Sequence, residues 1–183
     1  MNLELTNLHV LITGGSKGIG LACARGFIAE GARVTLVSRT LATLQSAQRE
    51  LQSATPSATV NIIAADLRNA ADAERMVDAV ERDFGAVDVL VNSAGAAKRT
   101  PAAELTTDAW HDAMQAKFFT YIHVINPLIK KMGARGRGAV VNVVGAGGKV
   151  AAVTHLAGGS ANAALMLASS GLAAAYAGKG VRV

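Results

Sequence analysis

Glycines crowd one short stretch of the chain, where Thr13-Gly14-Gly15-Ser16-Lys17-Gly18-Ile19-Gly20 follows an apolar run and precedes a helical pattern. Glycine lets a backbone approach a ligand closely, and the unpaired N–H groups at a helix N-terminus attract anions. A strand, a glycine-rich turn and a helix in this order are typical of loops that hold the pyrophosphate of a dinucleotide. The alternative is a plain tight turn between a strand and a helix.

A cation stands where the second strand is expected to end, at Ser38-Arg39, nineteen residues after Gly20. Loops that bind NAD usually have an acidic residue there, which accepts hydrogen bonds from the ribose 2′-hydroxyl. The guanidinium of Arg39 would instead pair with a 2′-phosphate, and Lys17 in the glycine loop would add a second positive charge. The two cations predict NADP(H) as the cofactor, unless Arg39 is only a solvated residue at a helix start.

Short apolar runs rich in Val, Ile and Leu alternate with longer helical patterns, as expected for parallel strands buried on both faces of a sheet. The predicted strands are Leu8–Thr13, Arg33–Ser38, Val60–Ala65, Val87–Asn92 and Ala139–Val144, and the predicted helices are Gly18–Glu30, Leu41–Ala54, Ala70–Phe84, Thr107–Met132 and Ser160–Ala177. This alternation predicts an α/β fold, a doubly wound parallel sheet of the Rossmann type in three αβα layers. We expect one domain over residues 1–183, cut off as a sixth strand begins at Gly180-Val181-Arg182-Val183.

The composition is that of an ordered chain, with 51% hydrophobic and 17% charged residues among 183. The net charge of +5 comes from scattered basic residues and small groups such as Lys130-Lys131, so we expect no nucleic-acid partner. The apolar segments are too short or too interrupted to span a membrane, and the first five residues lack the pattern of a signal peptide. With a single cysteine, Cys23, these features predict a cytoplasmic protein, and no metal site is expected.

Three motifs, in order and at the right spacing, resemble those of the short-chain dehydrogenase/reductase family. They are the loop over 13–20, similar to the family's Thr-Gly-x-x-x-Gly-x-Gly, the pair Asp66-Leu67, similar to its adenine-binding pair, and Asn92-Ser93-Ala94-Gly95, similar to its Asn-Asn-Ala-Gly. The resemblance implies that the cofactor is lined by Gly14, Ser16, Lys17, Gly18, Ile19, Gly20, Arg39, Asp66, Leu67, Asn92, Ala94 and Gly95. Alternatively, Asp66 only caps the segment that follows it and Gly95 is a turn glycine.

The family's catalytic Ser, Tyr, Lys and Asn are all absent from the positions where the motifs place them. Gly145 stands in place of the Ser, Gly158 of the Tyr, Asn162 of the Lys and Lys117 of the Asn. Because the last two form a reciprocal exchange, we hypothesise that Lys117 delivers an ammonium to nearly the same place, with Asn162 as its hydrogen-bond partner. The alternative is an ordinary surface lysine. His155 is a second candidate proton donor, or else an ordinary loop histidine.

The family transfers hydride between a nicotinamide cofactor and a carbonyl or alcohol, and its subunits commonly pair through the long helix and the last helix. The resemblance therefore implies an NADP(H)-dependent oxidoreductase with an atypical active site, a small carbonyl or alcohol substrate, and a homodimeric or homotetrameric assembly. The missing catalytic residues leave a second hypothesis open, a catalytically silent NADP(H)-binding module that acts through dimerisation. We also expect the family's C-terminal substrate-loop region to be absent.

Overall fold

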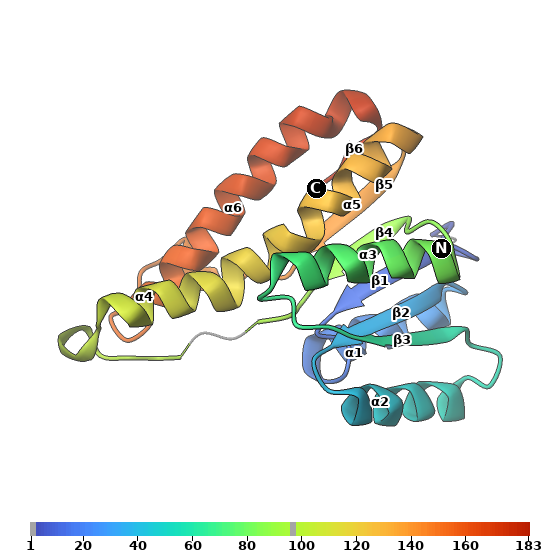
Figure 1. The fold of residues 1–183 in the computed structure, drawn as a ribbon, viewed down its shortest axis with the longest axis horizontal. Helices are drawn as coiled ribbons and strands as arrows, with labels where there is room; N and C mark the ends of the chain where they lie inside the picture. The colour runs from blue at the N-terminus through green and yellow to red at the C-terminus, as the bar shows by residue number, and fades with distance from the viewer. Residues whose placement is uncertain (1–2, 96–97) are drawn as a thin grey trace.

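The computed structural model describes residues 3–95 and 98–183, so Met1 and Asn2 of the N-terminal stretch considered above lie outside the described residues. Within these ranges, six parallel strands form one sheet in the order β3-β2-β1-β4-β5-β6 (Figure 1). The strands are β1 (His9–Thr13), β2 (Arg33–Ser38), β3 (Val60–Ala64), β4 (Val89–Asn92), β5 (Gly138–Asn142) and β6 (Val181–Arg182). This is the strand order of a dinucleotide-binding Rossmann sheet, which confirms the predicted fold class.

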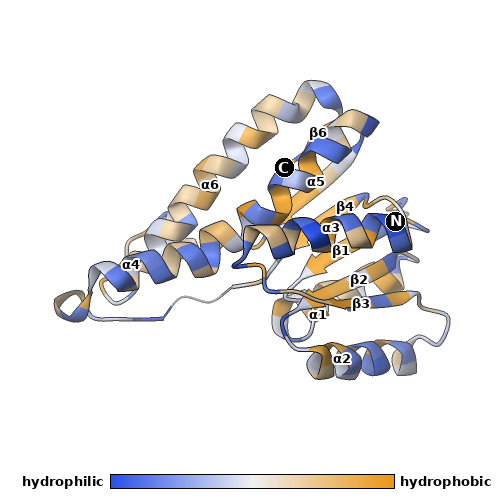
Figure 2. Ribbon diagram, viewed as in Figure 1, coloured by the Kyte–Doolittle hydropathy of each residue, from blue (hydrophilic) through white to orange (hydrophobic). Residues whose placement is uncertain are grey.

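Helices cover the two faces of the sheet and complete the three layers. They are α1 (Gly18–Ala29), α2 (Leu41–Ala54), α3 (Ala70–Phe84), α4 (Thr107–Ala113), α5 (Thr120–Arg135) and α6 (Leu156–Tyr176). α1 and α2 bury one face around Leu36 and Leu44, whereas α3, α5 and α6 bury the other around Leu11 and Ile125. Figure 2 shows hydrophobic residues gathered in the strands. The central strands β1 and β4 are buried along their whole length, as expected for strands enclosed from both sides, whereas Val141 on β5 is 48% exposed.

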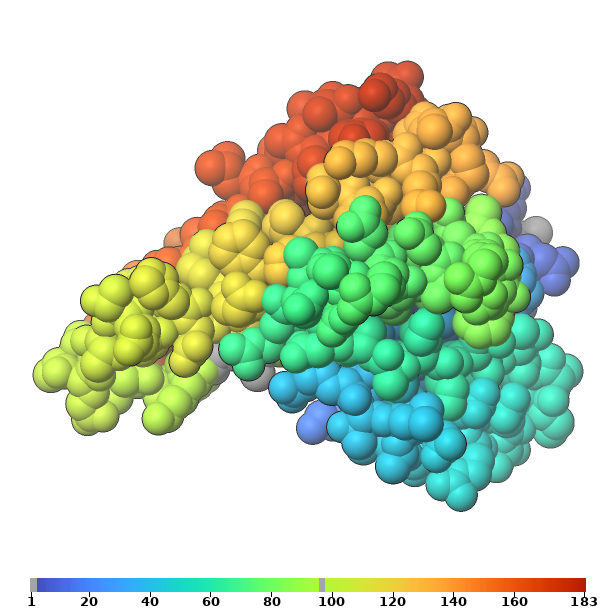
Figure 3. Space-filling view, in the orientation of Figure 1, coloured from blue at the N-terminus to red at the C-terminus, as the bar shows by residue number. Residues whose placement is uncertain are grey.

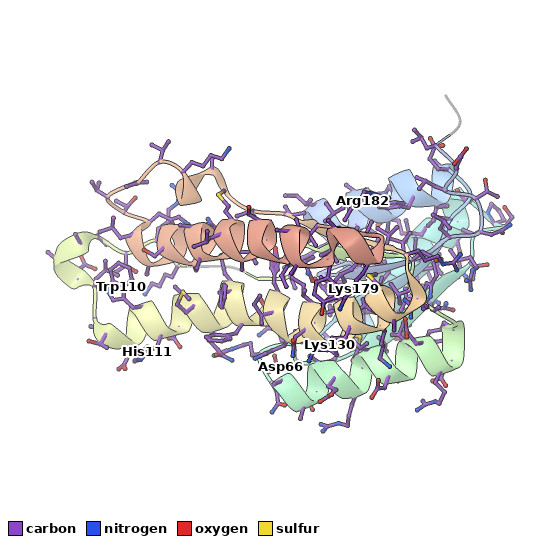
Figure 4. The ribbon with its side chains drawn as sticks, turned by 90° about the horizontal axis from the view of Figure 1, so that it is seen from above. Asp66, Trp110, His111, Lys130, Lys179 and Arg182 are labelled. Carbon is purple, nitrogen blue, oxygen red and sulfur yellow. The ribbon has the colours of Figure 1, made fainter. Side chains whose placement is uncertain are left out.

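A π-helical segment, Met114–Phe119, joins α4 to α5 in one continuous helical run. The sequence predicts a single helix over Thr107–Met132, but the run contains this π segment and continues to Arg135. The run and α6 lie side by side in both Figure 1 and Figure 4, and α6 packs against α4 and the π segment. Figure 3 shows the yellow-green region around α4 as a lobe that projects from the rest of the molecule. None of the described helices combines the length and apolarity needed to cross a bilayer.

The last helix begins at Leu156, four residues before the predicted start at Ser160. Gly158 and Gly159 read as helix breakers in the sequence, because glycine loses more entropy in a helix than other residues do. Both are buried here, and a Cβ at Gly159 would lie 2.8 Å from the carbonyl oxygen of Gly147. Close packing therefore outweighs helix propensity at this end of α6.

A buried histidine lies at the start of β1, at the opposite end of the strand from the glycine loop. The His9 ring is fully buried, with Nδ1 2.8 Å from the carbonyl oxygen of Gly85 and Nε2 2.8 Å from Oγ1 of Thr35. A carbonyl oxygen only accepts, so Nδ1 donates to Gly85 and the neutral ring accepts from the Thr35 hydroxyl at Nε2. Burial, together with the nearby positive charge of Arg33, lowers the pKa of His9 below its ordinary value, although Asp88 opposes this shift.

We expect the protein to lose stability as the pH falls below about 6.5, the pKa of an unfolded histidine. Below that pH the unfolded chain binds a proton at His9 that the folded protein resists, so each pH unit costs up to about 1.4 kcal/mol. Urea denaturation at pH 8 and pH 5.5 measures the difference, and His9→Gln should flatten it. The exposed His111 supplies the control, because His111→Gln should leave the pH dependence unchanged; an equal effect of both variants would contradict the assignment.

Candidate functional site

A chain of side-chain hydrogen bonds crosses the carboxyl ends of three neighbouring strands. Thr13 on β1 donates to Oδ1 of Asn92 on β4 at 3.2 Å, and Asn92 donates through Nδ2 to Oδ1 of Asn142 on β5 at 3.0 Å. Asn142 then donates to the hydroxyl of Ser169 on α6 at 2.9 Å, and that hydroxyl donates to the carbonyl oxygen of Leu165. Each donor in the chain has an acceptor, so the strand ends and α6 are held in fixed register.

The glycine loop over 13–20 begins at Thr13, the first residue of this hydrogen-bond chain, and its backbone packs against the backbone that follows β4. Thr13 Oγ1 also accepts from the N–H groups of Ser93 and Ala94, which brings the end of β4 beside the loop. Gly14 has φ +66°, and a Cβ there would lie 2.9 Å from the Ala94 backbone. A Cβ at Gly20 would lie 2.4 Å from the Gly14 carbonyl oxygen, so these two positions have no room for a side chain.

A cavity of about 680 Å³ extends along this loop and the ends of β2, β3 and β4. Ten of the twelve residues predicted to line a cofactor line it: Gly14, Ser16, Lys17, Gly18, Ile19, Arg39, Asp66, Leu67, Ala94 and Gly95. Its other lining residues are Val37, Ser38, Thr40, Thr43, Ala65, Arg68, Ser93, Ala116 and Thr120. The lining contains three cations, Lys17, Arg39 and Arg68, and one carboxylate, Asp66, so the described wall is positively charged on balance.

Two predicted cofactor residues, Gly20 and Asn92, do not line the cavity. Gly20 is buried beneath the loop, where it allows the close approach to Gly14, and Asn92 is fully buried in the hydrogen-bond chain. Asp66 lines the cavity and also accepts a hydrogen bond from the Arg68 N–H at 3.1 Å, as its alternative interpretation as a cap requires. The prediction that these residues bind a cofactor remains a prediction.

The start of α1 has the features that an anion needs. Its N-cap residue, Lys17, makes no side-chain capping bond, and the first turn contains no acidic residue. Gly18 has φ +57°, and nothing lies within 4 Å of the position that a Cβ would take. Lys17, Gly18 and Ile19 at this helix start all line the cavity, and the first N–H groups of a helix are the kind of donors that bind an anion.

Lys117 and Asn162 meet across the gap between the π-helical segment and α6. Lys117 donates from Nζ to Oδ1 of Asn162 at 3.1 Å, the contact that the exchange hypothesis predicts. Asn162 is only 2% exposed, and a Cβ at Gly145 would lie 2.8 Å from its Nδ2 atom. Gly158 is buried in the first turn of α6, so the site contains no hydroxyl at the two positions that it and Gly145 occupy.

Two other side chains near the site differ in their capacity to move a proton. The hydroxyl of Tyr121 donates to the carbonyl oxygen of Val143 at 2.9 Å, and burial raises its pKa to about 12, so this tyrosine is a structural residue. His155 is the N-cap of α6, and its ring borders Gly147. Its Nδ1 atom is buried without a hydrogen-bond partner in the part of the chain that the structure describes.

The sequence reasoning missed Ser169 and the π-helical segment. Ser169 lies inside a helix rich in small residues, where no local pattern distinguishes it from Ser170. The π segment has no sequence signal that separates it from the helix on either side, although such segments are frequent at functional sites. Arg68 follows Asp66-Leu67 directly in the sequence. That it lines the same cavity as Lys17 and Arg39 follows only from the fold, in which β2 and β3 lie side by side.

Comparison with known proteins places the chain in a family. Residues 8–183 match the family model described as short chain dehydrogenase, and the chain belongs to this family. It is 32% identical over 182 residues to D-threitol dehydrogenase of Mycolicibacterium smegmatis, covering 100% of this chain and 69% of that protein. It is 33% identical over 143 residues to gluconate 5-dehydrogenase of Gluconobacter oxydans, covering 76% of this chain and 54% of that protein.

A solved structure of similar architecture is the NADPH-bound short chain oxidoreductase of Pseudomonas aeruginosa PAO1, which contains an atypical catalytic center. The two superpose with a TM-score of 0.92 at 30% identity, over 97% of this chain and 70% of that one. The chain thus spans between about half and about two thirds of the length of these relatives.

Two of the three glycines of α1, Gly20 and Gly26, give a matched test of the loop packing. Gly20→Ala should lower the free energy of unfolding by about 1–3 kcal/mol, because the added Cβ overlaps the Gly14 carbonyl. Gly26→Ala lies in the same helix with nothing within 4 Å of its Cβ, and it should raise stability by about 0.5–1 kcal/mol. Urea denaturation of both variants measures the two free energies of unfolding. Equal changes of the same sign in the two variants would refute the prediction.

The hydrogen-bond chain predicts an effect of Ser169→Ala on stability of about 1–3 kcal/mol, because Asn142 Nδ2 would lose its acceptor. Ser170→Ala is the control, since that neighbouring serine is exposed and should change stability by less than about 0.5 kcal/mol. Thermal unfolding of the two variants side by side gives the comparison. If Ser169→Ala left the stability unchanged, the hydrogen bond from Asn142 to Ser169 would contribute nothing to it.

Proposed function

We propose that the cavity holds a nicotinamide dinucleotide and prefers NADP(H). The observation that carries the proposal is the position of Arg39 at the end of β2, on the wall that Lys17 and Arg68 also form. Three cations in the lining of one cavity suit a 2′-phosphate, whereas a ribose 2′-hydroxyl is usually bound by a carboxylate at the position of Arg39. The start of α1 and the glycine loop over 13–20, which both line the cavity, would hold the pyrophosphate.

We propose oxidoreduction between a small carbonyl compound and the matching alcohol. Membership of the short-chain dehydrogenase family supports this reaction, as do the activities in the names of its relatives, a D-threitol dehydrogenase and a gluconate 5-dehydrogenase. The nucleotide would supply or accept the hydride. Lys117 and His155 are the residues near the strand ends that could move a proton, which makes the active site atypical, as in the Pseudomonas aeruginosa relative.

A silent NADP(H)-binding module is the second candidate, favoured by one specific observation. Gly145 and Gly158 leave no hydroxyl at the positions where the family resemblance implies the catalytic serine and tyrosine. Such a protein would bind NADPH and reduce no carbonyl compound. Consumption of NADPH in the presence of carbonyl substrates, followed at 340 nm, separates the two functions.

We also propose that residues 1–183 act as one domain within a cytoplasmic homodimer or homotetramer. Leu167 on α6 is 77% exposed and Phe119 at the end of the π segment 38% exposed, on the two helices through which the family commonly pairs. Apolar side chains at these sites suit a helix-to-helix interface. The free thiol of Cys23 suits a reducing compartment.

The NADP(H) preference is tested by calorimetric titration with NADPH and with NADH. The unaltered protein should bind NADPH more tightly, and Arg39→Glu should weaken NADPH binding about 10- to 100-fold while changing NADH binding little. Arg49→Glu makes the same charge change at an exposed site on α2 outside the cavity lining, so it should bind as the unaltered protein does. Equal affinity for the two nucleotides would refute the preference, and no binding of either would refute the proposed site.

A further inference from the structure

Lys117 extends from the π-helical segment toward α6 and is half-buried. Its Nζ donates to Asn162 Oδ1, and it makes no ion pair within residues 3–95 and 98–183. A lysine usually keeps its ammonium in water or beside a carboxylate, because a buried, unpaired charge is costly. Here the ammonium is turned inward and bound to a neutral amide, which a purely structural role does not require.

The root of this side chain lies at one end of the cavity. A Cβ at Gly95 would lie 3.5 Å from the Lys117 Cα and 2.4 Å from the carbonyl oxygen of Ala116, so the π-helical segment packs directly on the turn that follows β4. Ala116 and Thr120 line the cavity, whereas Lys117 points past its end toward α6. Arg39 lies at the end of β2 and the Lys117 segment packs beside the end of β4, two strands away in the sheet.

Asn162 is held in one orientation by the glycine-rich backbone around it. Its Nδ2 lies against Gly145, with 2.8 Å to the position of a Cβ there, and a Cβ at Gly148 would lie 2.9 Å from the Asn162 Cβ. With Nδ2 directed at Gly145, Oδ1 is directed at Lys117. Asn162 is therefore a positioning residue, and it occupies the space that a side chain at position 145 would need.

We propose that the Lys117 ammonium, positioned by Asn162, is the proton donor to the carbonyl oxygen of the substrate and the acceptor of that proton in the reverse direction. This inference rests on the proposed function, since it needs a reduced nicotinamide dinucleotide as the co-reactant. It assigns to Lys117 the role that a tyrosine hydroxyl has in the family resemblance. It also explains why the lysine is turned toward Asn162 on α6.

The reaction balances with these groups alone. A reduced nicotinamide dinucleotide, when bound, would supply the hydride that forms the new C–H bond as the C=O π bond breaks, and would itself be oxidised. The carbonyl oxygen takes a proton from Lys117 Nζ, so one O–H bond forms and one N–H bond breaks. The neutral amine then regains a proton from water. Burial lowers the pKa of Lys117 from its ordinary value, which brings the ammonium closer to the range in which an acid is effective.

The test compares Lys117→Met and Lys117→Arg with Lys130→Met, a control at an exposed lysine on the same helical run. NADPH affinity is measured by calorimetry, and reduction of 2,3-butanedione and a panel of ketoses is followed at 340 nm. Both Lys117 variants should bind NADPH within about threefold of the unaltered protein, whereas kcat should fall about 100-fold or more. Lys117→Arg keeps the charge and the length, so it serves if Lys117→Met fails to fold.

A second readout follows the Lys117 amine itself, without turnover. Acetylation by acetic anhydride at a series of pH values, with mass spectrometry of the Lys117 peptide, should give half-maximal labelling below pH 10.5, the ordinary pKa of a lysine. Asn162→Asp replaces the neutral acceptor with a carboxylate of the same shape. It should raise the pH of half-maximal labelling and shift the alkaline limb of the kcat profile to higher pH.

The outcomes separate the inference from the function on which it rests. Absence of NADPH binding by the unaltered protein would overturn the proposed function and, with it, the role of Lys117. NADPH binding without reduction of any carbonyl in the panel would overturn the proton-donor role and favour the silent module. Full activity of Lys117→Met would also overturn the proton-donor role of Lys117. If His155→Gln lost activity while Lys117→Met kept it, the proton donor would be His155.

Discussion

The hydrogen bonds that link Thr13, Asn92, Asn142 and Ser169 are the constraint on which the rest of the site depends. Polar side chains at the ends of buried strands are costly unless every donor and acceptor is matched, and here they are matched from β1 to α6. The same Thr13 oxygen holds two N–H groups beyond β4, which fixes that turn against the glycine loop. The glycine loop after β1 and the facing part of α6 are thereby joined through the carboxyl ends of β4 and β5.

Much of the fold could be predicted because its signals are local. Continuous runs of Val, Ile and Leu identify buried strands, and the glycine loop has a recognisable strand–turn–helix setting. The sequence pattern predicts a start of α6 four residues too late, because Gly158 and Gly159 disfavour a helix and the close packing of Gly159 on the backbone of Gly147 exists only in the fold. Helix propensity is visible in the sequence, and the neighbour that overrides it is not.

In the candidate site, too, some residue pairs could be predicted from the sequence and others only from the fold. Arg39 and Lys17 could be paired from sequence because a Rossmann unit places the end of its second strand close to its glycine loop. Lys117 and Asn162 could be paired only by comparison with a family pattern, and their 3.1 Å contact gives that comparison a physical form. The link from Asn142 to Ser169 has no sequence signal at all, since it joins two elements that meet only in the folded sheet.

The π-helical segment has a consequence for how this protein can change. Such a segment holds one residue more than an α-helix needs over the same turn, and one residue corresponds to about 100° of rotation. Removing one residue between Met114 and Phe119 would therefore leave a regular helix with α4 and α5 near their present orientation. A deletion within α4 or α5 themselves would instead turn one helix relative to the other by about 100°, and Trp110 and Ile125 could then no longer both keep their present neighbours. The π segment is thus the part of the run where loss of one residue disturbs the packing least, so natural variation in length should occur here more readily than in α4 or α5.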